Sequence, residues 1–218
     1  MKSLSREEAP AVKKLTVFDL DGTLVDSAAD LHASVNHALA AVGLPLRTLE
    51  EVRGFVGEGA RRLLERAVGP RLDLLEPALA AWEVHYAAHM LDRTRLYPGL
   101  EDELARAGRT LAILTNKPGP AARHIVEGLG LGPRFAAVVG GGEAPRKPDP
   151  AGLLALIARL GSTPAGTVFV GDSVVDVQTA RNARVPVVAV TWGFGRREDL
   201  AGADVLADRA AELAPFLR

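Results

Sequence analysis

Two aspartates stand at the end of an apolar run near the start of the chain. The segment LTVFDLDGTLVDS, residues 15–27, has the composition of a buried β-strand and carries Asp19 and Asp21 where the run ends. Side chains two residues apart in a strand lie on the same face, so the two carboxylates repel each other. Such a pair is costly unless a cation lies between the carboxylates or one of them holds a proton. Either outcome indicates chemistry at this position.

Other polar residues also follow apolar runs. They are Thr115 and Asn116 in LTNKP, Lys147 in RKPDP, and Asp172 and Asp176 in GDSVVD. In an open parallel sheet, ligands bind beyond the carboxyl ends of the strands, so these residues are expected to share one edge with Asp19 and Asp21. Several carboxylates suit Mg²⁺, which prefers oxygen ligands and usually shares its coordination sphere with substrate phosphate and water. A lysine beside that ion predicts a site for a phosphoryl group.

Apolar runs also predict the elements that must position these residues. Strands are expected at 14–20, 110–115, 167–171 and 185–191, with a weaker one at 135–140. The four stronger runs are apolar without alternation, which favours strands covered on both faces. Helical patterns fill the gaps from residue 110 onward, so strand and helix alternate. This order predicts an α/β fold with a doubly wound parallel sheet, a Rossmann-like core.

The stretch between the first and second predicted strands is far longer than a simple βαβ crossover requires. It contains helical patterns and no convincing strand. We predict that residues 28–92 form an inserted helical cap, with hinges near Ser27 and near residues 97–99, while residues 1–27 and 93–218 form the catalytic core. A lid over the site is the natural use of such an insert.

Composition excludes several classes of function. The chain has 218 residues, 48% of them hydrophobic, which suits one domain with a smaller insert. Its net charge of -1 and its scattered Lys and Arg residues give no support to nucleic-acid binding. The lack of cysteine excludes disulfides and thiolate chemistry. The polar N-terminus, residues 1–14, is expected to be a frayed lead-in with no signal peptide or membrane span. We therefore predict a cytoplasmic protein. For its assembly we expect a monomer or a homodimer.

Four motifs in order, DLDGT, LTN, RKPDP and GDSVVD, resemble those of the haloacid dehalogenase superfamily of phosphatases. The likeness spans the chain from residue 14. Within the superfamily the chain most resembles the phosphoglycolate phosphatases with a small helical cap, through DLDGTLVDS, GFVGEGARRLLERAVG, YPG, LTNKP, KPDP and GDSVVD. One departure is the short glycine-rich stretch GGGEAPRKPDP, which leaves the path of the loop before Lys147 open.

The resemblance implies roles for the acidic residues. Asp19 would attack phosphorus and become an aspartyl phosphate, which splits one difficult displacement into two. Asp21 would protonate the leaving alkoxide and then activate water. The implied Mg²⁺ ligands are Asp19, the backbone carbonyl of Asp21, and Asp172.

The remaining motif residues would act around the phosphoryl group. Thr115, Asn116 and Lys147 would bind its oxygens, whose charge in a loose transition state needs to be neutralised. Asp176, one helical turn after Asp172, would orient a metal-bound water or Lys147. The implied reaction is Mg²⁺-dependent hydrolysis of a small phosphorylated metabolite, in particular of 2-phosphoglycolate to glycolate and phosphate.

The sequence GFVGEGARRLL suggests where the cap meets the substrate. It places Gly57 and Gly59 before a helix that continues through Arg61 and Arg62. Free backbone N–H groups and a cation could therefore meet an anion at one helix N-terminus. We predict that the loop from Gly57 to Arg61 faces the carboxylate of phosphoglycolate and supplies much of the discrimination between substrates.

For other residues the pattern favours a structural role or leaves two roles open. His85 and His89 are four apart on a predicted helix, but no third ligand is evident, so we interpret them as structural. Lys117 and Arg146 flank motif residues and are either substrate contacts or solvated charges. The aromatic residues predicted to belong to the cap core are Trp82 and Tyr86.

Other functions fit parts of the pattern. A sugar-phosphate mutase of the β-phosphoglucomutase type and a pyrophosphatase or nucleotidase would use the same core. A phosphorylated receiver module also places acids, a Thr and a Lys at strand ends. It needs adjacent acids and a shorter chain, whereas Leu20 separates Asp19 from Asp21 and a helical insert follows.

Overall fold

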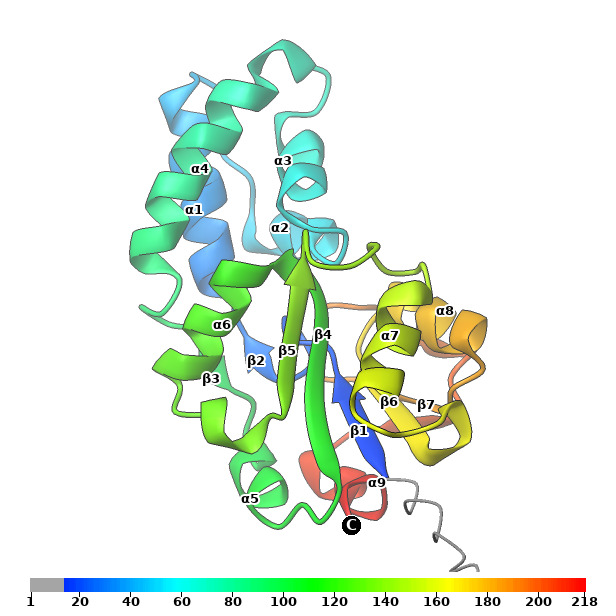
Figure 1. Cartoon of the computed structure of the whole chain (residues 1–218). Coiled ribbons are helices and arrows are strands. Elements are labelled where there is room, and N and C mark those ends of the chain that lie inside the picture. The colour runs from blue at the N-terminus through cyan, green and yellow to red at the C-terminus, as the bar shows by residue number, and fades with distance from the viewer. Residues whose placement is uncertain (1–13) are drawn as a thin grey trace, which may run out of the picture.

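A six-stranded parallel sheet forms the centre of the computed structural model, which describes residues 14–218 (Figure 1). Its strands lie in the order β5-β4-β1-β6-β7-β8, and every neighbouring pair is parallel. They are β1 (Leu15–Phe18), β4 (Thr110–Pro118), β5 (Ala137–Gly141), β6 (Thr167–Gly171), β7 (Val187–Val190) and β8 (Val205–Ala207). The predicted α/β fold is confirmed, and residues 1–13 of the predicted N-terminal lead-in lie outside the described residues.

Helices cover both faces of this sheet. They are α5 (Leu100–Ala105), α6 (Gly119–Gly128), α7 (Ala151–Arg159), α8 (Val174–Ala183) and α9 (Ala214–Leu217). Short 3₁₀ turns lie at Leu72–Leu74, Gly132–Arg134, Pro164–Gly166, Arg197–Leu200 and Ala210–Leu213. Leu15 and Val17 of β1 are buried in one apolar core with α7 and α8, whereas Phe18 is buried in the other with α5, α6 and α9. Non-alternating apolar runs therefore become strands because each face has its own core to fill.

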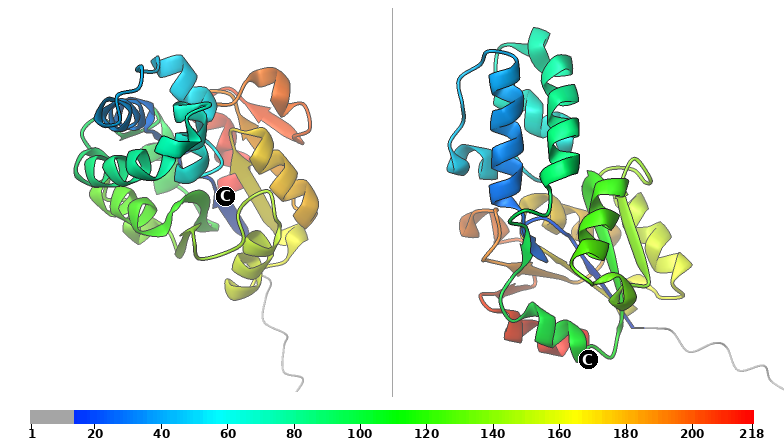
Figure 2. Two further views of the ribbon diagram at one scale, coloured as in Figure 1. Left: turned by 90° about the horizontal axis from the view of Figure 1, so that it is seen from above. Right: turned by 90° about the vertical axis from the view of Figure 1, so that its left-hand side faces the viewer.

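Four helices stand beyond the carboxyl ends of the sheet strands (Figures 1 and 2). They are α1 (Ala28–Ala41), α2 (Leu49–Phe55), α3 (Ala60–Val68) and α4 (Leu75–His89), and we call them the cap helices. Leu31, Val35 and Leu39 of α1 are buried together with Trp82 and Tyr86 of α4. The two aromatic residues are thus part of the cap core, as predicted.

A two-stranded antiparallel ribbon joins the cap helices to the sheet. It pairs β2 (Val25–Asp26) with β3 (Arg95–Leu96), in the register Val25 with Leu96. Buried Asp30 fixes the return of the chain, because its carboxylate accepts hydrogen bonds from the N–H groups of Arg93 and Thr94. The sequence suggested no strand here, since two-residue strands leave no periodic pattern to detect. The division into core and cap domains stays a prediction.

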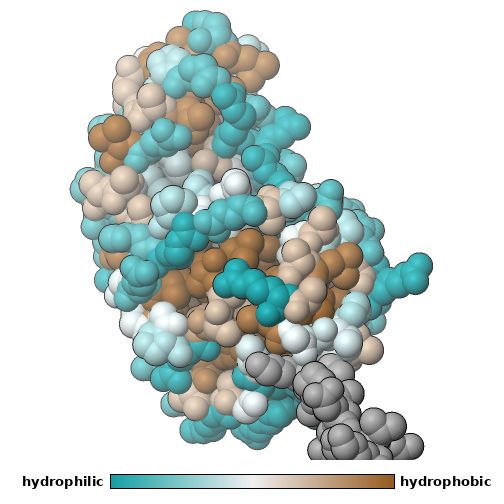
Figure 3. Space-filling model, viewed as in Figure 1, coloured by the Kyte–Doolittle hydropathy of each residue, from teal (hydrophilic) through white to brown (hydrophobic). Residues whose placement is uncertain are grey.

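The surface mixes apolar and hydrophilic residues, as the face in Figure 3 shows. The large exposed apolar side chains include Leu46, Leu72 and Val84 on the cap. Among the helices of residues 14–218, none has the length and apolar character that crossing a bilayer would require.

Three histidines stack on the cap helices. The ring of His85 in α4 lies 4.2 Å from that of His37 in α1 and 4.3 Å from that of His89, measured between centroids. No three-ligand group of metal-binding side chains within residues 14–218 includes them, and His89 instead contacts Asp92 at 2.8 Å. Burial lowers the pKa of His85, and the neighbouring imidazoles of His37 and His89 lower it further.

This stack is expected to make stability fall in mild acid. The unfolded chain protonates His85 near its ordinary pKa of about 6.5, whereas the folded chain resists protonation, so unfolding takes up a proton as the pH falls below that value. The raised pKa values of Asp19 and Asp172 act in the opposite direction. The test therefore compares the change in Tm between pH 7.5 and pH 5.5 in a variant with the same change in wild type. In His85→Gln the decrease in Tm should be smaller by about 1–2 °C. In the control His124→Gln, which replaces an exposed histidine, the decrease should equal that of wild type. Equal slopes for His85→Gln and wild type would contradict the expectation.

Candidate active site

The two aspartates at the end of β1 each face a different lysine. The Asp19 carboxylate lies 2.8 Å from the Nζ of Lys147. The Asp21 carboxylate oxygens lie 2.9 and 3.0 Å from the Nζ of Lys117, and one of them also accepts a hydrogen bond from the Ser27 hydroxyl at 2.6 Å. The expected repulsion between the acids is thus relieved by two ammonium groups, each paired with one carboxylate.

Lys147 is held between two carboxylates. Its Nζ lies 2.7 Å from Asp176 and 2.8 Å from Asp19, and its side chain is buried. Burial opposes the charge, but the two carboxylates outweigh it and raise the pKa of Lys147. The other oxygen of Asp176 accepts hydrogen bonds from the hydroxyl and N–H of Ser173 and so closes the capping box that begins α8. Asp176 therefore lies in position to orient Lys147.

Asp172 is fixed from two sides at the end of β6. One carboxylate oxygen accepts a hydrogen bond from the Thr23 hydroxyl, and the other accepts one from the N–H of Phe194, each at 2.8 Å. Glycine is required opposite, because a Cβ on Gly22 or Gly193 would come within 2.3 Å of the Asp172 side chain. Gly22 also has a φ of 83°, which favours glycine.

The buried acids form a group suited to a divalent cation. Within residues 14–218, carboxylate oxygens of Asp19, Asp172 and Asp176 lie within 4.8 Å of one another. Burial raises the pKa of Asp172 to about 7 and that of Asp19 to about 6, and neighbouring carboxylates add to both shifts. Raised carboxyl pKa values of this kind indicate that the buried negative charges are not fully balanced by nearby positive charge.

The charge balance of the site fits one divalent cation. The four acids of the site outnumber its two lysines by two negative charges, which one divalent cation would balance. Both oxygens of Asp176 already have hydrogen-bond partners. The oxygens of Asp172 also accept hydrogen bonds, from Thr23 and Phe194, so all three buried acids remain side chains that could hold a divalent cation.

Thr115 and Asn116, at the end of β4, are both buried beside these acids. The Asn116 amide differs from prediction because both of its polar atoms have protein partners. Its nitrogen donates to the carbonyls of Gly57 and Lys147, and its oxygen accepts from the N–H of Lys147. The Asn116 side chain thus fixes the loop that carries Lys147, whose path the sequence left open, and joins it to the cap.

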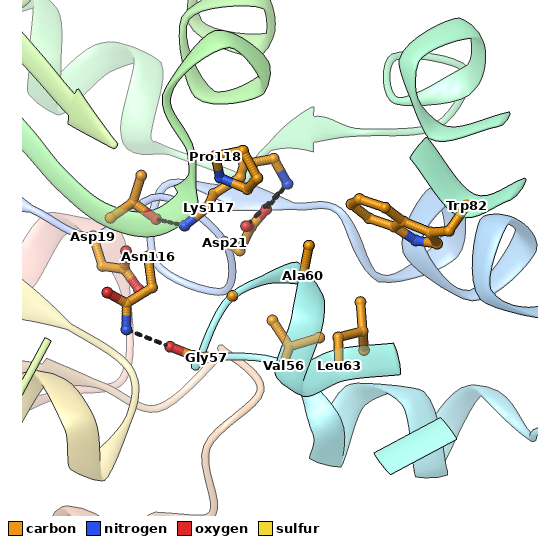
Figure 4. A pocket seen from close by; sticks show the side chains of 12 residues that line it. Asp19, Asp21, Val56, Gly57, Ala60, Leu63, Trp82, Asn116, Lys117 and Pro118 are labelled. Carbon is orange, nitrogen blue, oxygen red and sulfur yellow. Dashed lines mark hydrogen bonds and ion pairs between the residues drawn. The ribbon is translucent and has the colours of Figure 1, made fainter. Parts of the chain in front are cut away.

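A cavity lies between the cap and the sheet edge (Figure 4). Its core-side lining is Asp19, Asp21, Thr115, Asn116, Lys117 and Pro118, and its cap-side lining is Val56, Gly57, Gly59, Ala60, Leu63 and Trp82. A wider cleft reaches Asp19, Asp21 and Asp172 from another side, past Arg53 and Arg196. Asp19 and Asp21 therefore line both the cavity and the cleft.

The predicted cap loop is only partly brought to this cavity. Gly57 and Gly59 line it, but Arg61 does not. The Arg61 side chain is 47% exposed and pairs with Glu76 at 2.7 Å. Helical spacing explains the difference, because Ala60 and Leu63 turn toward the cavity and so direct Arg61 away from it.

Lys117 is the functional candidate that the sequence left undecided. Its side chain is buried beside Asp21, whereas Arg146, which shared the same two readings, is exposed. The sequence signal for a role of Lys117 was its position directly after Thr115 and Asn116 in the motif LTNKP. Nothing in the sequence indicated that the hydroxyl of Tyr86, on a cap helix, would lie 2.6 Å from the Lys117 Nζ.

Comparison with known proteins places this geometry among related chains. Residues 16–190 match the model of the haloacid dehalogenase-like hydrolase family. A phosphoglycolate phosphatase of Agrobacterium fabrum is 41% identical over 214 residues, covering 93% of this chain and 91% of the relative. One of Mesorhizobium japonicum is 41% identical over 194 residues, covering 85% and 86%. The crystal structure of a predicted phosphoglycolate phosphatase from Haemophilus somnus has a TM-score of 0.88 at 32% identity, covering 94% of this chain and 98% of that one.

Proposed function

The chain belongs to the haloacid dehalogenase-like hydrolases and is a phosphatase, and from this premise we propose that it hydrolyses 2-phosphoglycolate to glycolate and phosphate with Mg²⁺, through an aspartyl phosphate on Asp19. The observation that carries the proposal is the separate pairing of the two acids. Asp19 pairs with Lys147 within the cluster of buried acids, whereas Asp21 pairs with Lys117 beside the cavity. In this proposal Asp19 is the nucleophile and Asp21 is the general acid and base.

In the first step a carboxylate oxygen of Asp19 attacks phosphorus. A new P–O bond forms as the ester P–O bond breaks, and the leaving glycolate oxygen takes a proton from Asp21, which enters this step as a carboxylic acid. Lys147 lies beside Asp19 and neutralises charge on the phosphoryl oxygens, and Thr115 contributes a hydroxyl from the adjacent strand end. Asp19, the backbone carbonyl of Asp21, and Asp172 would hold Mg²⁺, which would supply further neutralisation of the phosphoryl charge.

In the second step water attacks the aspartyl phosphate. Asp21, now a carboxylate, takes a proton from that water, and phosphate leaves as the Asp19 carboxylate is regenerated. The hydroxyl of Ser27 and the ammonium of Lys117 hold Asp21 in place through both steps. Asp176 keeps Lys147 in position through an ion pair of 2.7 Å.

A phosphate-release screen with and without Mg²⁺ tests the proposal. The compounds are phosphoglycolate, β-glucose 1-phosphate, a nucleoside monophosphate and pyrophosphate. We expect the highest kcat/KM for phosphoglycolate and loss of turnover when EDTA removes the metal. Isomerisation of the glucose phosphate with little phosphate release would instead indicate a mutase, and a higher kcat/KM for pyrophosphate or the nucleotide would also contradict the proposal. The cytoplasmic location and the choice between monomer and homodimer stay predictions.

A further inference from the structure

The proposed chemistry gives Lys117 no role toward the substrate, yet this lysine lines the cavity where the leaving group must lie. Its side chain is 5% exposed, and its Nζ contacts both Asp21 oxygens and, at 2.6 Å, the hydroxyl of Tyr86. The ammonium also lies 4.7 Å from the centroid of the Tyr86 ring. Figure 4 shows Lys117 beside Asp21, with Trp82 across the cavity.

The cavity is lined by one cation, two carboxylates and an apolar wall from the cap. Among the residues of 14–218 that line it, Lys117 alone carries a positive charge. The facing wall from the cap consists of Val56, Ala60, Leu63 and Trp82, with the two glycines of the loop. An anion that leaves water for such a space needs a charged partner.

One partner of the Lys117 ammonium is a neutral group that an anion could replace. Lysine offers three N–H donors, and its side-chain partners among the described residues are Asp21 and Tyr86. Burial raises the pKa of Tyr86 to about 12, so its hydroxyl stays neutral and does not compete as an anion. A carboxylate in the cavity could therefore take the N–H that the neutral Tyr86 hydroxyl now accepts.

We propose that Lys117 determines substrate specificity by binding a carboxylate on the leaving group. This inference rests on the proposed function, in which Asp21 meets the leaving oxygen. Since Lys117 lies against Asp21, an anionic group a short carbon chain away from that oxygen lies within reach of the ammonium. Lys117 thus takes the role that the sequence suggested for Arg61, whose side chain pairs with Glu76 instead.

The test compares phosphoglycolate with ethyl phosphate, which has the same two-carbon length but no carboxylate. In wild type we expect kcat/KM for phosphoglycolate to exceed that for ethyl phosphate. Lys117→Met, which keeps the length of the side chain, should lower that ratio roughly 10- to 100-fold. The loss should appear mainly as a raised KM for phosphoglycolate, whereas any effect through Asp21 should lower kcat for both esters alike.

Three further variants complete the test. Lys14→Met makes the same change on an exposed lysine before β1 and should leave the ratio unchanged. Lys117→Arg keeps the charge but moves the N–H donors, so it should lower the ratio by a smaller factor than Lys117→Met. This variant also tests the inference if Lys117→Met does not fold. If Arg61→Met lowers the ratio and Lys117→Met does not, Arg61 is the specificity residue and the inference is overturned.

The outcomes for wild type and variants separate the two proposals. A wild-type ratio near one contradicts both the proposed substrate and the role of Lys117. A high wild-type ratio that Lys117→Met and Lys117→Arg leave unchanged contradicts the role of Lys117 alone.

Discussion

Asp19→Asn is expected to abolish turnover and leave the fold intact. The amide has nearly the shape of the carboxylate but cannot form the aspartyl phosphate, so kcat should fall by roughly 10⁴- to 10⁶-fold, as when other enzymes lose their nucleophile. Stability in the absence of metal should be retained or increased. Asp19 is buried with Asp172 and Asp176, and the substitution removes one of these crowded negative charges.

Three measurements check this expectation. Phosphate release gives the loss of turnover, thermal unfolding gives the stability, and ³¹P NMR shows whether phosphate still binds beside Lys147. Asp73→Asn is the matched control, because Asp73 is an exposed cap residue paired with Arg71. Steady turnover by a pure Asp19→Asn preparation would refute the covalent mechanism. In wild type, a single turnover in H₂¹⁸O should leave ¹⁸O in released phosphate without labelling Asp19.

Asp172→Asn is expected to impair Mg²⁺ binding while preserving the local structure. An asparagine can keep both hydrogen bonds, because its oxygen still accepts from Phe194 N–H and the Thr23 hydroxyl can accept from its amide. Only the charge and one oxygen ligand are lost. Even groups that merely support metal ligands change affinity by about 10- to 100-fold, so the half-saturating Mg²⁺ concentration should rise by at least about 100-fold.

Metal titrations by two methods check this second expectation. Activity against Mg²⁺ gives the apparent affinity, and Mn²⁺ binding followed by electron paramagnetic resonance gives an affinity that does not depend on turnover. Asp73→Asn again serves as the control. An unchanged titration in both methods would show that Asp172 is not a metal ligand.

The positions of the five longer strands and of the acids were predictable because they depend on local sequence. The predicted strand at 167–171 coincides with β6, and its end brings Asp172 to the sheet edge. The edge strand β8 was missed, because it has three residues and two of them, Val205 and Leu206, are exposed. A short and partly exposed strand has neither the continuous apolar run nor the alternation that marks a strand.

The pairing of the lysines was not predictable because it depends on tertiary geometry. The register between β4 and β5 shifts between Leu114 and Pro118, the stretch that contains Thr115, Asn116 and Lys117. Such an irregularity changes the direction of side chains relative to simple alternation. The sequence could place Lys117 at the correct sheet edge but could not assign it to Asp21 and Tyr86.

The β2–β3 ribbon has a consequence for how the chain folds. The adjacent strands β1 and β4 are far apart in sequence, since Leu15 pairs with Thr110 and the cap helices come between. Bringing such distant segments together costs loop-closure entropy that grows with the length of the intervening chain, and non-local pairing slows folding. Once Val25 pairs with Leu96, most of that chain lies within a closed loop and only short segments separate the ribbon from the sheet. Early docking of α1 on α4 would therefore speed the pairing of β1 with β4.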